Sequence, residues 1–161
     1  MDLLKTQDVE AERVKLELRL LQLETQERAT SNFLDFCKYV WPEMIVGEHH
    51  RRIAKALDRV VSGQCKRLMI AMPPRHGKSQ MGSYLFPAYL MGKKPDSKLI
   101  VGSHTAELAQ RFGRMIRNLV ADERYLELFP DMALSADSKA AGRWDTSLGG
   151  EAFFKIGRAH V

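Results

Sequence analysis

The stretch of residues 66–79 constrains the fold more than any other part of the sequence. Residues 66–72 have an apolar centre that is bounded by charges and then by prolines, which predicts a buried strand. A loop of residues 73–77 follows, and an apolar helix is expected to begin near Lys78. A strand, a short loop and a helix in this order place the loop at the amino end of a helix, where backbone N–H groups favour an anion.

The loop carries a partial phosphate-binding motif. Gly77, Lys78 and Ser79 match the end of the pattern G-x-x-x-x-G-K-[ST], with Met72 in place of the first glycine. Glycine lets the backbone approach a phosphate closely, because it has no Cβ. The tripeptide alone is a weak signal, and its position between the predicted strand and helix strengthens it.

The motif assigns a chemical role to most loop positions. We expect Lys78 to reach the β- and γ-phosphates as a point charge, and the Ser79 hydroxyl to ligate Mg²⁺. Arg75 is an additional cation placed to contact the γ-phosphate, so Arg75 and Lys78 are the predicted catalytic residues. The predicted ATP-binding residues are Pro74, Arg75, His76, Gly77, Lys78 and Ser79.

Composition restricts the class of protein. The 161 residues are 45% hydrophobic and 28% charged, which excludes a disordered or collagen-like chain. The longest unbroken apolar run is residues 68–72, too short for a membrane span, so we expect no membrane partner. Two cysteines cannot make a disulfide framework. Residues 1–30 carry net charge −2 and residues 31–161 net charge +7, which suits a polyphosphate or nucleic-acid partner or an ordinary basic surface.

Helices are predicted over much of the chain. Residues 1–30 form a long polar helix with a stripe of Val9, Leu16, Leu20 and Leu23 that Arg13 interrupts. Packing on its own domain is the favoured role of this extension, and a partner-binding helix or short coiled coil is the alternative. Further helices are predicted at Phe33–Val40, after a possible N-cap in residues 30–32, at Glu48–Val61 and at residues 105–120.

Strand signals complete the predicted architecture. Residues 98–102 are predicted to form a second buried strand, and Gly149-Gly150 separates two short segments that predict a β-hairpin. Alternating strands and helices predict an α/β fold, a parallel sheet flanked by helices with an N-terminal helical extension. Trp144 is expected to serve packing, with stacking near the site as the alternative. The arginines at 111, 114 and 117 are expected to form a solvated helix face, with contact to DNA phosphates as the alternative. Single histidines are expected to lie in loops or at the surface.

At this point the sequence resembles the large terminase subunit of tailed bacteriophages, the ATPase of the DNA-packaging motor. The segment M-P-P-R-H-G-K-S at residues 72–79 looks like that family's variant Walker A loop. Four more segments agree in order: residues 33–42, the E-H-H-x-x-I of residues 48–53, S-H-T at 103–105, and R-W-D-T with G-G at 143–150. Glu48 stands where tryptophan is usual in the family.

The resemblance implies a P-loop NTPase fold of the helicase-like ASCE type over residues 31–155, with ATP and Mg²⁺ as cofactors. It implies double-stranded viral DNA, a portal protein and a small terminase subunit as partners, in a homo-oligomeric ring on the procapsid in the cytoplasm of a bacterial host cell. It gives Arg75 the role of a γ-phosphate sensor or cis arginine finger, and places residues near His49 and His50 close to the adenine. It also implies a nuclease domain, to which no residue here can be assigned.

An ATPase of this type also needs a strand that ends in acidic residues, and no apolar segment after Ser79 runs into Asp or Glu. We therefore expect a partial ATPase domain, incomplete at its C-terminus, that is inactive alone. Residues 156–161 are expected to be a non-native tail, because ATC GGA AGA GCA CAC GTC, a common sequencing adapter, encodes them. Two alternatives stay open: another P-loop helicase or remodelling ATPase, and a nucleotide-binding module without turnover.

Overall fold

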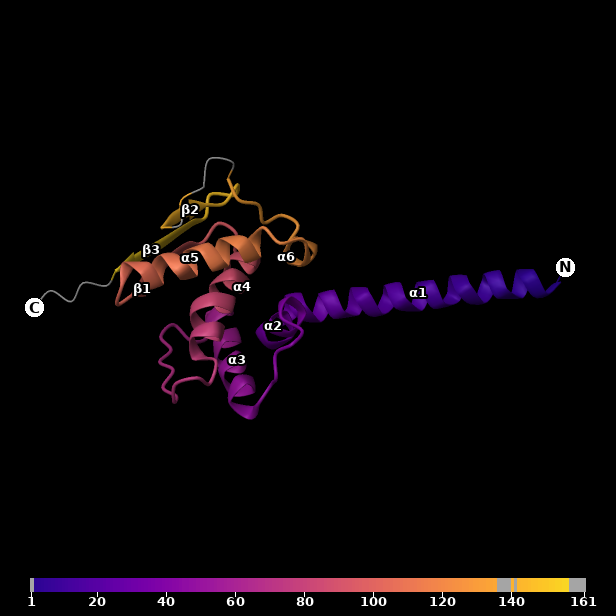
Figure 1. The fold of residues 1–161 in the computed structure, drawn as a ribbon, viewed down its shortest axis with the longest axis horizontal. Coiled ribbons are helices and arrows are strands. Elements are labelled where there is room, and N and C mark those ends of the chain that lie inside the picture. Colours follow the sequence, from indigo (N-terminus) through magenta and orange to yellow (C-terminus); the bar gives the residue numbers. More distant parts are fainter. Residues whose placement is uncertain (1, 136–139, 141, 157–161) are drawn as a thin grey trace, which may run out of the picture.

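The computed structural model describes residues 2–135, 140 and 142–156. Helices dominate the described chain, and a small sheet lies near its C-terminal end (Figure 1). The elements in order are α1 (Asp2–Ser31), α2 (Phe33–Val40), α3 (Glu48–Val61), the π-helix η1 (Gln80–Leu85), α4 (Phe86–Lys93), β1 (Lys98–Ser103), α5 (Ala106–Val120), α6 (Glu123–Leu128), β2 (Arg143–Asp145) and β3 (Glu151–Ile156).

The sheet has three strands in the order β1-β3-β2. β1 pairs with β3 in parallel, with Leu99 opposite Ala152, and β2 pairs with β3 antiparallel, with Trp144 also opposite Ala152. Helix α5 packs on β1 and β3 and covers one face of the sheet. The second predicted strand and the hairpin are thus confirmed, and the fold is mixed α/β with helices flanking a small sheet. The prediction of a parallel sheet is wrong, because the hairpin makes β2 antiparallel to β3 and the sheet is mixed. Trp144 is fully buried and stacks on Phe154, so its predicted packing role is confirmed.

Local capping explains where the helices begin. The Asn32 side chain accepts a hydrogen bond from Asp35 N at the start of α2, and the Thr105 side chain accepts one from Leu108 N at the start of α5. Helix α2 ends at Val40, because Pro42 pushes the residue before it, Trp41, out of the helical region. The predicted helices at residues 33–40, 48–61 and 105–120 are confirmed to within one residue.

A cluster of aromatic side chains joins the helices into one body. Tyr89 of α4 lies 5.1 Å from Phe36 and 5.5 Å from Phe33 between ring centroids, and Phe129 lies 5.2 Å from Tyr125. All are buried, and Tyr125 Oη donates a hydrogen bond of 2.8 Å to the carbonyl of Ala88. We call Phe33, Phe36, Tyr89, Tyr125 and Phe129 the aromatic cluster.

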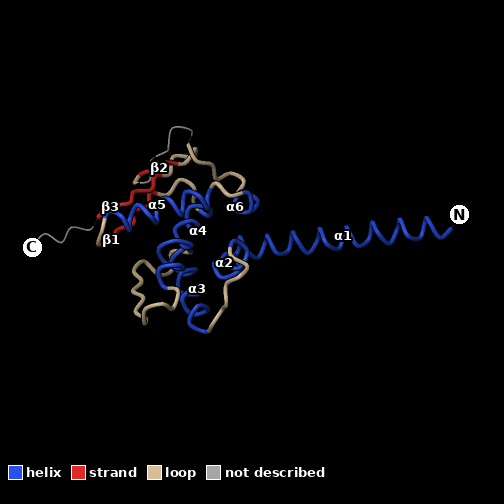
Figure 2. Tube along the Cα trace, viewed as in Figure 1, coloured by secondary structure: helices blue, strands red, loops and turns tan. Residues whose placement is uncertain are grey.

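The predicted strand at residues 66–72 is wrong. This segment forms no ladder with any strand in the described part of the chain, and 92% of Met69 is exposed. Figure 2 shows it as part of a long loop beside α3, separate from the sheet. An extended segment becomes a strand only when a neighbouring strand supplies hydrogen-bond partners, and hydrophobicity alone does not create that neighbour. The loop of residues 73–77 therefore does not follow a strand of the sheet.

The long N-terminal helix has two environments. Its last turns pack on α2 and α6, where Ala29 is fully buried. Residues 8–24 are exposed, and this part of α1 projects away from the body (Figure 1). The favoured prediction, packing on its own domain, is therefore right only for the C-terminal end of α1. No helix in the described part of the chain combines the length and apolar character that a membrane crossing requires.

Pro87 explains an irregular turn in the helix that follows the loop. Helical backbone runs from Lys78 to Lys93, and η1 takes up its third to eighth residues, Gln80–Leu85. Phe86 N bonds to Met81 O, five residues back, just before Pro87. Proline has no N–H and its ring clashes with a carbonyl four residues back, so the wider π turn relieves both conflicts.

Candidate functional site

The loop between residues 73 and 79 is a compact turn. Arg75 adopts a φ of 63° and Gly77 a φ of 81°, both in the left-handed region. Arg75 is the one non-glycine residue with positive φ among the described residues. A side chain there costs about 1–2 kcal/mol, and such strain concentrates at functional sites. Alternation of left-handed and right-handed residues turns successive N–H groups toward one side, the geometry of anion-binding nests.

The end of this loop is the start of a helix. Lys78 is the first helical residue, and Met81 N donates to Gly77 O at 2.9 Å in the first helical hydrogen bond. The N–H groups of a first turn have no acceptor within the helix, so those of residues 78–80 are available to a ligand at the loop. The side chains of Lys78 and Ser79 are exposed at this end.

Gly77 is required at its position for two reasons. Its φ of 81° is one that L side chains rarely adopt. A Cβ on Gly77 would also lie 2.9 Å from His50 Nε2, closer than real Cβ atoms approach other atoms. The imidazole of α3 thus lies against the backbone of the loop, at the point where the motif demands glycine.

Three histidines meet beside the loop. Gly47 N donates to His50 Nδ1 at 3.0 Å, so the proton of His50 is on Nε2 and is donated to His49 Nε2 at 3.1 Å. His76 Nδ1 donates to the carbonyl of Pro74 at 2.8 Å, and its ring lies 5.7 Å from that of His49. Burial, together with the charge of His49, lowers the pKa of His50, which favours its neutral form.

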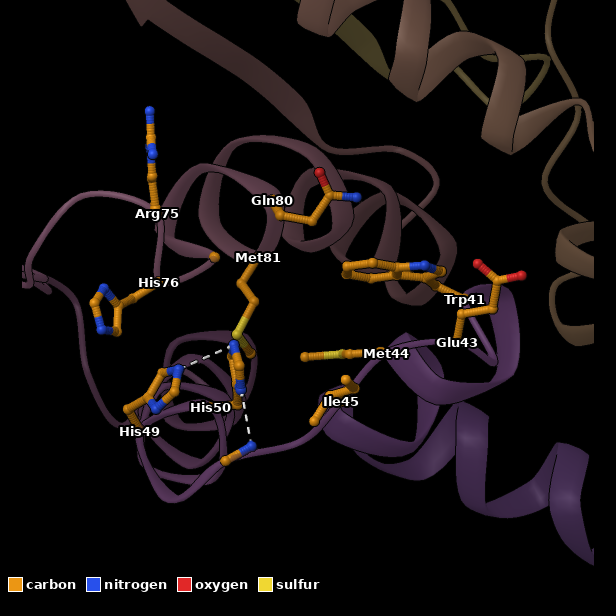
Figure 3. A pocket seen from close by; sticks show the side chains of 12 residues that line it. Trp41, Glu43, Met44, Ile45, His49, His50, Arg75, His76, Gln80 and Met81 are labelled. Carbon is orange, nitrogen blue, oxygen red and sulfur yellow. Dashed lines mark hydrogen bonds between the residues drawn. The ribbon is translucent and has the colours of Figure 1, made fainter.

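A cavity of about 520 Å³ opens next to the loop, between it and the segment that leads from α2 into α3 (Figure 3). Its size is typical of sites for small organic ligands. Apolar and aromatic groups make up much of its wall, with Trp41 lying flat along one side and Arg75 extending away from the other side chains. The lining residues are Trp41, Glu43, Met44, Ile45, Gly47, His49, His50, Arg75, His76, Gly77, Gln80 and Met81.

The structure brings the predicted site residues together in part. Residues 74–79 form one turn, and three of them, Arg75, His76 and Gly77, line the cavity. Pro74, Lys78 and Ser79 are exposed at the loop and do not line it. The predicted position of the loop after a buried strand is wrong, because residues 66–72 pair with no strand in the described part of the chain. The cavity beside the loop lies against the start of α3 instead.

Sequence reasoning missed the other wall of the cavity. Met44 and Ile45 carry no motif, Trp41 belongs to a segment given no role at the site, and only the tertiary fold brings residues 41–47 next to residues 75–81. The resemblance implies that residues near His49 and His50 lie close to an adenine, and this stays a prediction. Comparison of the chain with protein-family models, with curated proteins and with solved structures found no match.

Proposed function

We propose that this chain binds a nucleoside triphosphate, ATP with Mg²⁺, at residues 72–79, and that it is the N-terminal ATPase part of a terminase large subunit with a P-loop NTPase fold. The observation that carries the proposal is the turn at Gly77, whose left-handed φ favours glycine where the motif has it and whose backbone lies against His50. Lys78 and Ser79 then begin a helix, as phosphate binding requires.

Each loop residue has a role in this proposal. The amides at the start of the helix and the ammonium of Lys78 hold the β- and γ-phosphates, and the Ser79 hydroxyl holds Mg²⁺. This donor set fits the metal, because Mg²⁺ is usually held by few protein oxygens together with substrate phosphates. When bound, the ion neutralises charge on the phosphates. The exposed guanidinium of Arg75 is free to turn toward the γ-phosphate.

The cavity beside the loop supplies a place for the base and sugar. Trp41 offers a flat aromatic surface for stacking, and Gln80 offers an amide that can both donate and accept hydrogen bonds. His49 and His50 lie on the opposite wall, next to Gly77. A nucleotide with its phosphates on the loop and its base in this cavity uses both halves of the site.

ATP hydrolysis needs a carboxylate at the end of an apolar strand, and the described residues offer none there. After Ser79, β1 runs into Ser103 and His104, and the described part of β3 contains no acid after Glu151. We therefore expect this chain to bind ATP with little hydrolysis on its own. Double-stranded viral DNA, the portal protein, the small terminase subunit and a ring on the procapsid belong to the proposal through the sequence resemblance alone.

Tryptophan fluorescence tests the proposal directly. Trp41 lines the cavity and is partly exposed, whereas Trp144 is fully buried in the sheet, so ATP with Mg²⁺ should quench the emission of Trp41. Lys78→Ala should weaken ATP binding by at least about 100-fold, because the change removes a charge-assisted contact to phosphate. Lys55→Ala, at an exposed lysine of α3, is the matched control and should bind normally.

The following outcomes discriminate between the proposed function and its alternatives. Equal ATP affinity of wild type and Lys78→Ala would contradict the loop assignment. Binding with robust hydrolysis by this chain would contradict the inference that the catalytic carboxylate is missing. Arg75→Ala should spare binding and reduce turnover in a protein that hydrolyses ATP. Paired helicase motifs in a second domain of a longer protein would favour the helicase alternative.

A further inference from the structure

The exposed part of α1 presents apolar side chains to solvent over several turns. Residues 8–24 are exposed, although seven of them are large and apolar: Val9, Val14, Leu16, Leu18, Leu20, Leu21 and Leu23. The last turns of the same helix are held by the body, so the exposed part is presented as a preformed helix (Figure 1). A monomer rarely exposes so much apolar surface without a partner.

These side chains form two stripes on opposite sides of the helix. At about 100° per residue, Val9, Leu16, Leu20 and Leu23 lie on the side away from Ala29, which the body buries; we call them the outer stripe. Ala11, Val14, Leu18 and Leu21 lie on the same side as Ala29; we call them the inner stripe. The body occupies the inner side at the C-terminal end of α1, so only the outer stripe is unobstructed along its whole length.

The outer stripe has the spacing of a coiled-coil seam. Val9, Leu16 and Leu23 are seven residues apart and take the d positions of a heptad, and Arg13 and Leu20 take the a positions. Leucine at d is typical of two-stranded coils, and a polar residue at one a position specifies register and oligomeric state. Arg13 already bonds to Glu17 at 3.0 Å along the helix, so its charge reaches the edge of the seam.

Charges beside the seam select the occupant and its orientation. Glu10, Glu17 and Glu24 take the e positions, and Glu12, Arg19 and Gln26 take the g positions. In a parallel pair of α1 helices, Arg19 meets the partner's Glu24 and Arg13 lies beside the partner's Glu12. Two like-charge contacts oppose them, Glu12 with the partner's Glu17 and Arg13 with the partner's Arg13 across the seam, where the neighbouring Glu12 side chains offset the arginine charges.

An antiparallel pair is disfavoured by the same charges. Like positions then face each other, which sets Glu17 against the partner's Glu17 and Arg19 against the partner's Arg19. Glu10 would also face the partner's Glu24. The sequence of α1 therefore complements a second copy of itself in the parallel orientation.

We propose that α1 pairs in parallel with α1 of a second copy of this chain through the outer stripe, as a two-stranded coiled coil over residues 9–23. This inference goes beyond nucleotide binding and does not depend on it. The pairing buries the leucines of the outer stripe and leaves the inner stripe and the loop of residues 72–79 accessible.

Analytical ultracentrifugation of the full chain tests the proposal with a matched pair of variants. Leu20→Glu in the outer stripe and Leu18→Glu in the inner stripe change leucines that are 59% and 57% exposed, so neither change disturbs the folded body. We expect wild type and Leu18→Glu to form dimers with a Kd of about 1–100 µM. Leu20→Glu should raise the Kd by at least about 100-fold, because it places two carboxylates in the apolar seam.

A cross-link reports the orientation. In the parallel pair, residue 13 of one copy faces residue 13 of the other, whereas in an antiparallel pair it faces residue 23. Arg13→Cys in a Cys65→Ser background should therefore form a disulfide-linked dimer under mild oxidation, because Cys37 is buried. Arg19→Glu should weaken the dimer, and adding Glu24→Arg should restore it.

Three results would overturn the proposal. The first is a wild-type chain that stays monomeric up to about 1 mM. The second is a dimer that Leu18→Glu dissociates and that Leu20→Glu leaves intact. The third is a dimer in which Arg13→Cys forms no cross-link. Circular dichroism of each variant, with the helical signal of wild type, verifies that the comparison is made between folded chains.

Discussion

The aromatic cluster and residues 66–79 lie at opposite ends of one helical run, residues 78–93, and they are built in opposite ways. At the C-terminal end, rings from α2, α4 and the α6 region pack at centroid distances of 5.1–6.3 Å and are buried. At the N-terminal end, the loop is exposed. Its shape depends on tight turns, on the left-handed backbone conformation of Arg75 and Gly77, and on the contact of Gly77 with His50. Packing fixes the first region, and backbone conformation fixes the second.

This difference separates stability from the proposed chemistry. A change in the aromatic cluster should unfold the chain without a specific effect on ligand binding. A change in residues 66–79 should alter ligand binding with a smaller effect on the free energy of unfolding. The four predictions that follow test this separation from the largest expected effect to the smallest.

Phe36→Ala should have the largest effect on stability. The ring of Phe36 is fully buried and contacts four other rings of the aromatic cluster. Its removal should lower the free energy of unfolding by about 3–5 kcal/mol, because a cavity remains where the rings met. Urea denaturation followed by circular dichroism measures this loss, and a loss below about 1 kcal/mol would show that the cluster is not the centre of stability.

Gly77→Ala should act on the loop through backbone conformation. The change forces a Cβ into a left-handed residue and against His50, so we expect a loss of about 1–3 kcal/mol in stability and at least about a tenfold loss in ATP affinity. Gly82→Ala is the control, because a Cβ there meets nothing within 4 Å in the described structure. Gly82→Ala should keep ATP affinity and leave stability unchanged or slightly higher. If both variants lost ATP affinity equally, the conformation of Gly77 would not explain the loss.

His50, beside the loop, should make stability depend on pH. Burial and the charge of His49 lower the pKa of His50 below 6.5 in the folded chain, so the unfolded chain binds this proton more tightly. Stability is therefore complete above about pH 6.5 and decreases as the pH falls below it. Urea midpoints measured between about pH 5 and 7.5 should rise with pH, and His50→Asn should flatten part of the rise. His104→Asn, at an exposed histidine outside the site, should leave the slope as it is.

The same contrast explains which features could be predicted from sequence. The helices at residues 33–40, 48–61 and 106–120 follow from signals inside each segment: apolar spacing and, at Asn32 and Thr105, side-chain caps. The hairpin follows from Gly149-Gly150 in the same way. Local signals decide local structure, so these elements needed no knowledge of the rest of the molecule.

Features that depend on distant partners could not be predicted in this way. Whether residues 66–72 join a sheet depends on a neighbouring strand, and their apolar character is the same with or without one. The wall formed by Trp41, Met44 and Ile45 exists only because α3 returns the chain toward the loop. The site residues of the loop were predictable because the motif is contiguous, and their position relative to the sheet was not.

Met69→Ser should have the smallest effect, and it tests the one strand that the sequence predicted wrongly. In a buried strand, loss of this methionine would cost about 2–5 kcal/mol, whereas an exposed side chain loses almost no contacts. With 92% of Met69 exposed, we expect a change within about 0.5 kcal/mol in urea denaturation. Ile70→Ser is the matched comparison, because Ile70 is partly buried against the core and its loss should be larger. A large loss at Met69 would mean that residues 66–72 pack against an apolar surface after all, and the contrast between the two ends of the helix would no longer hold.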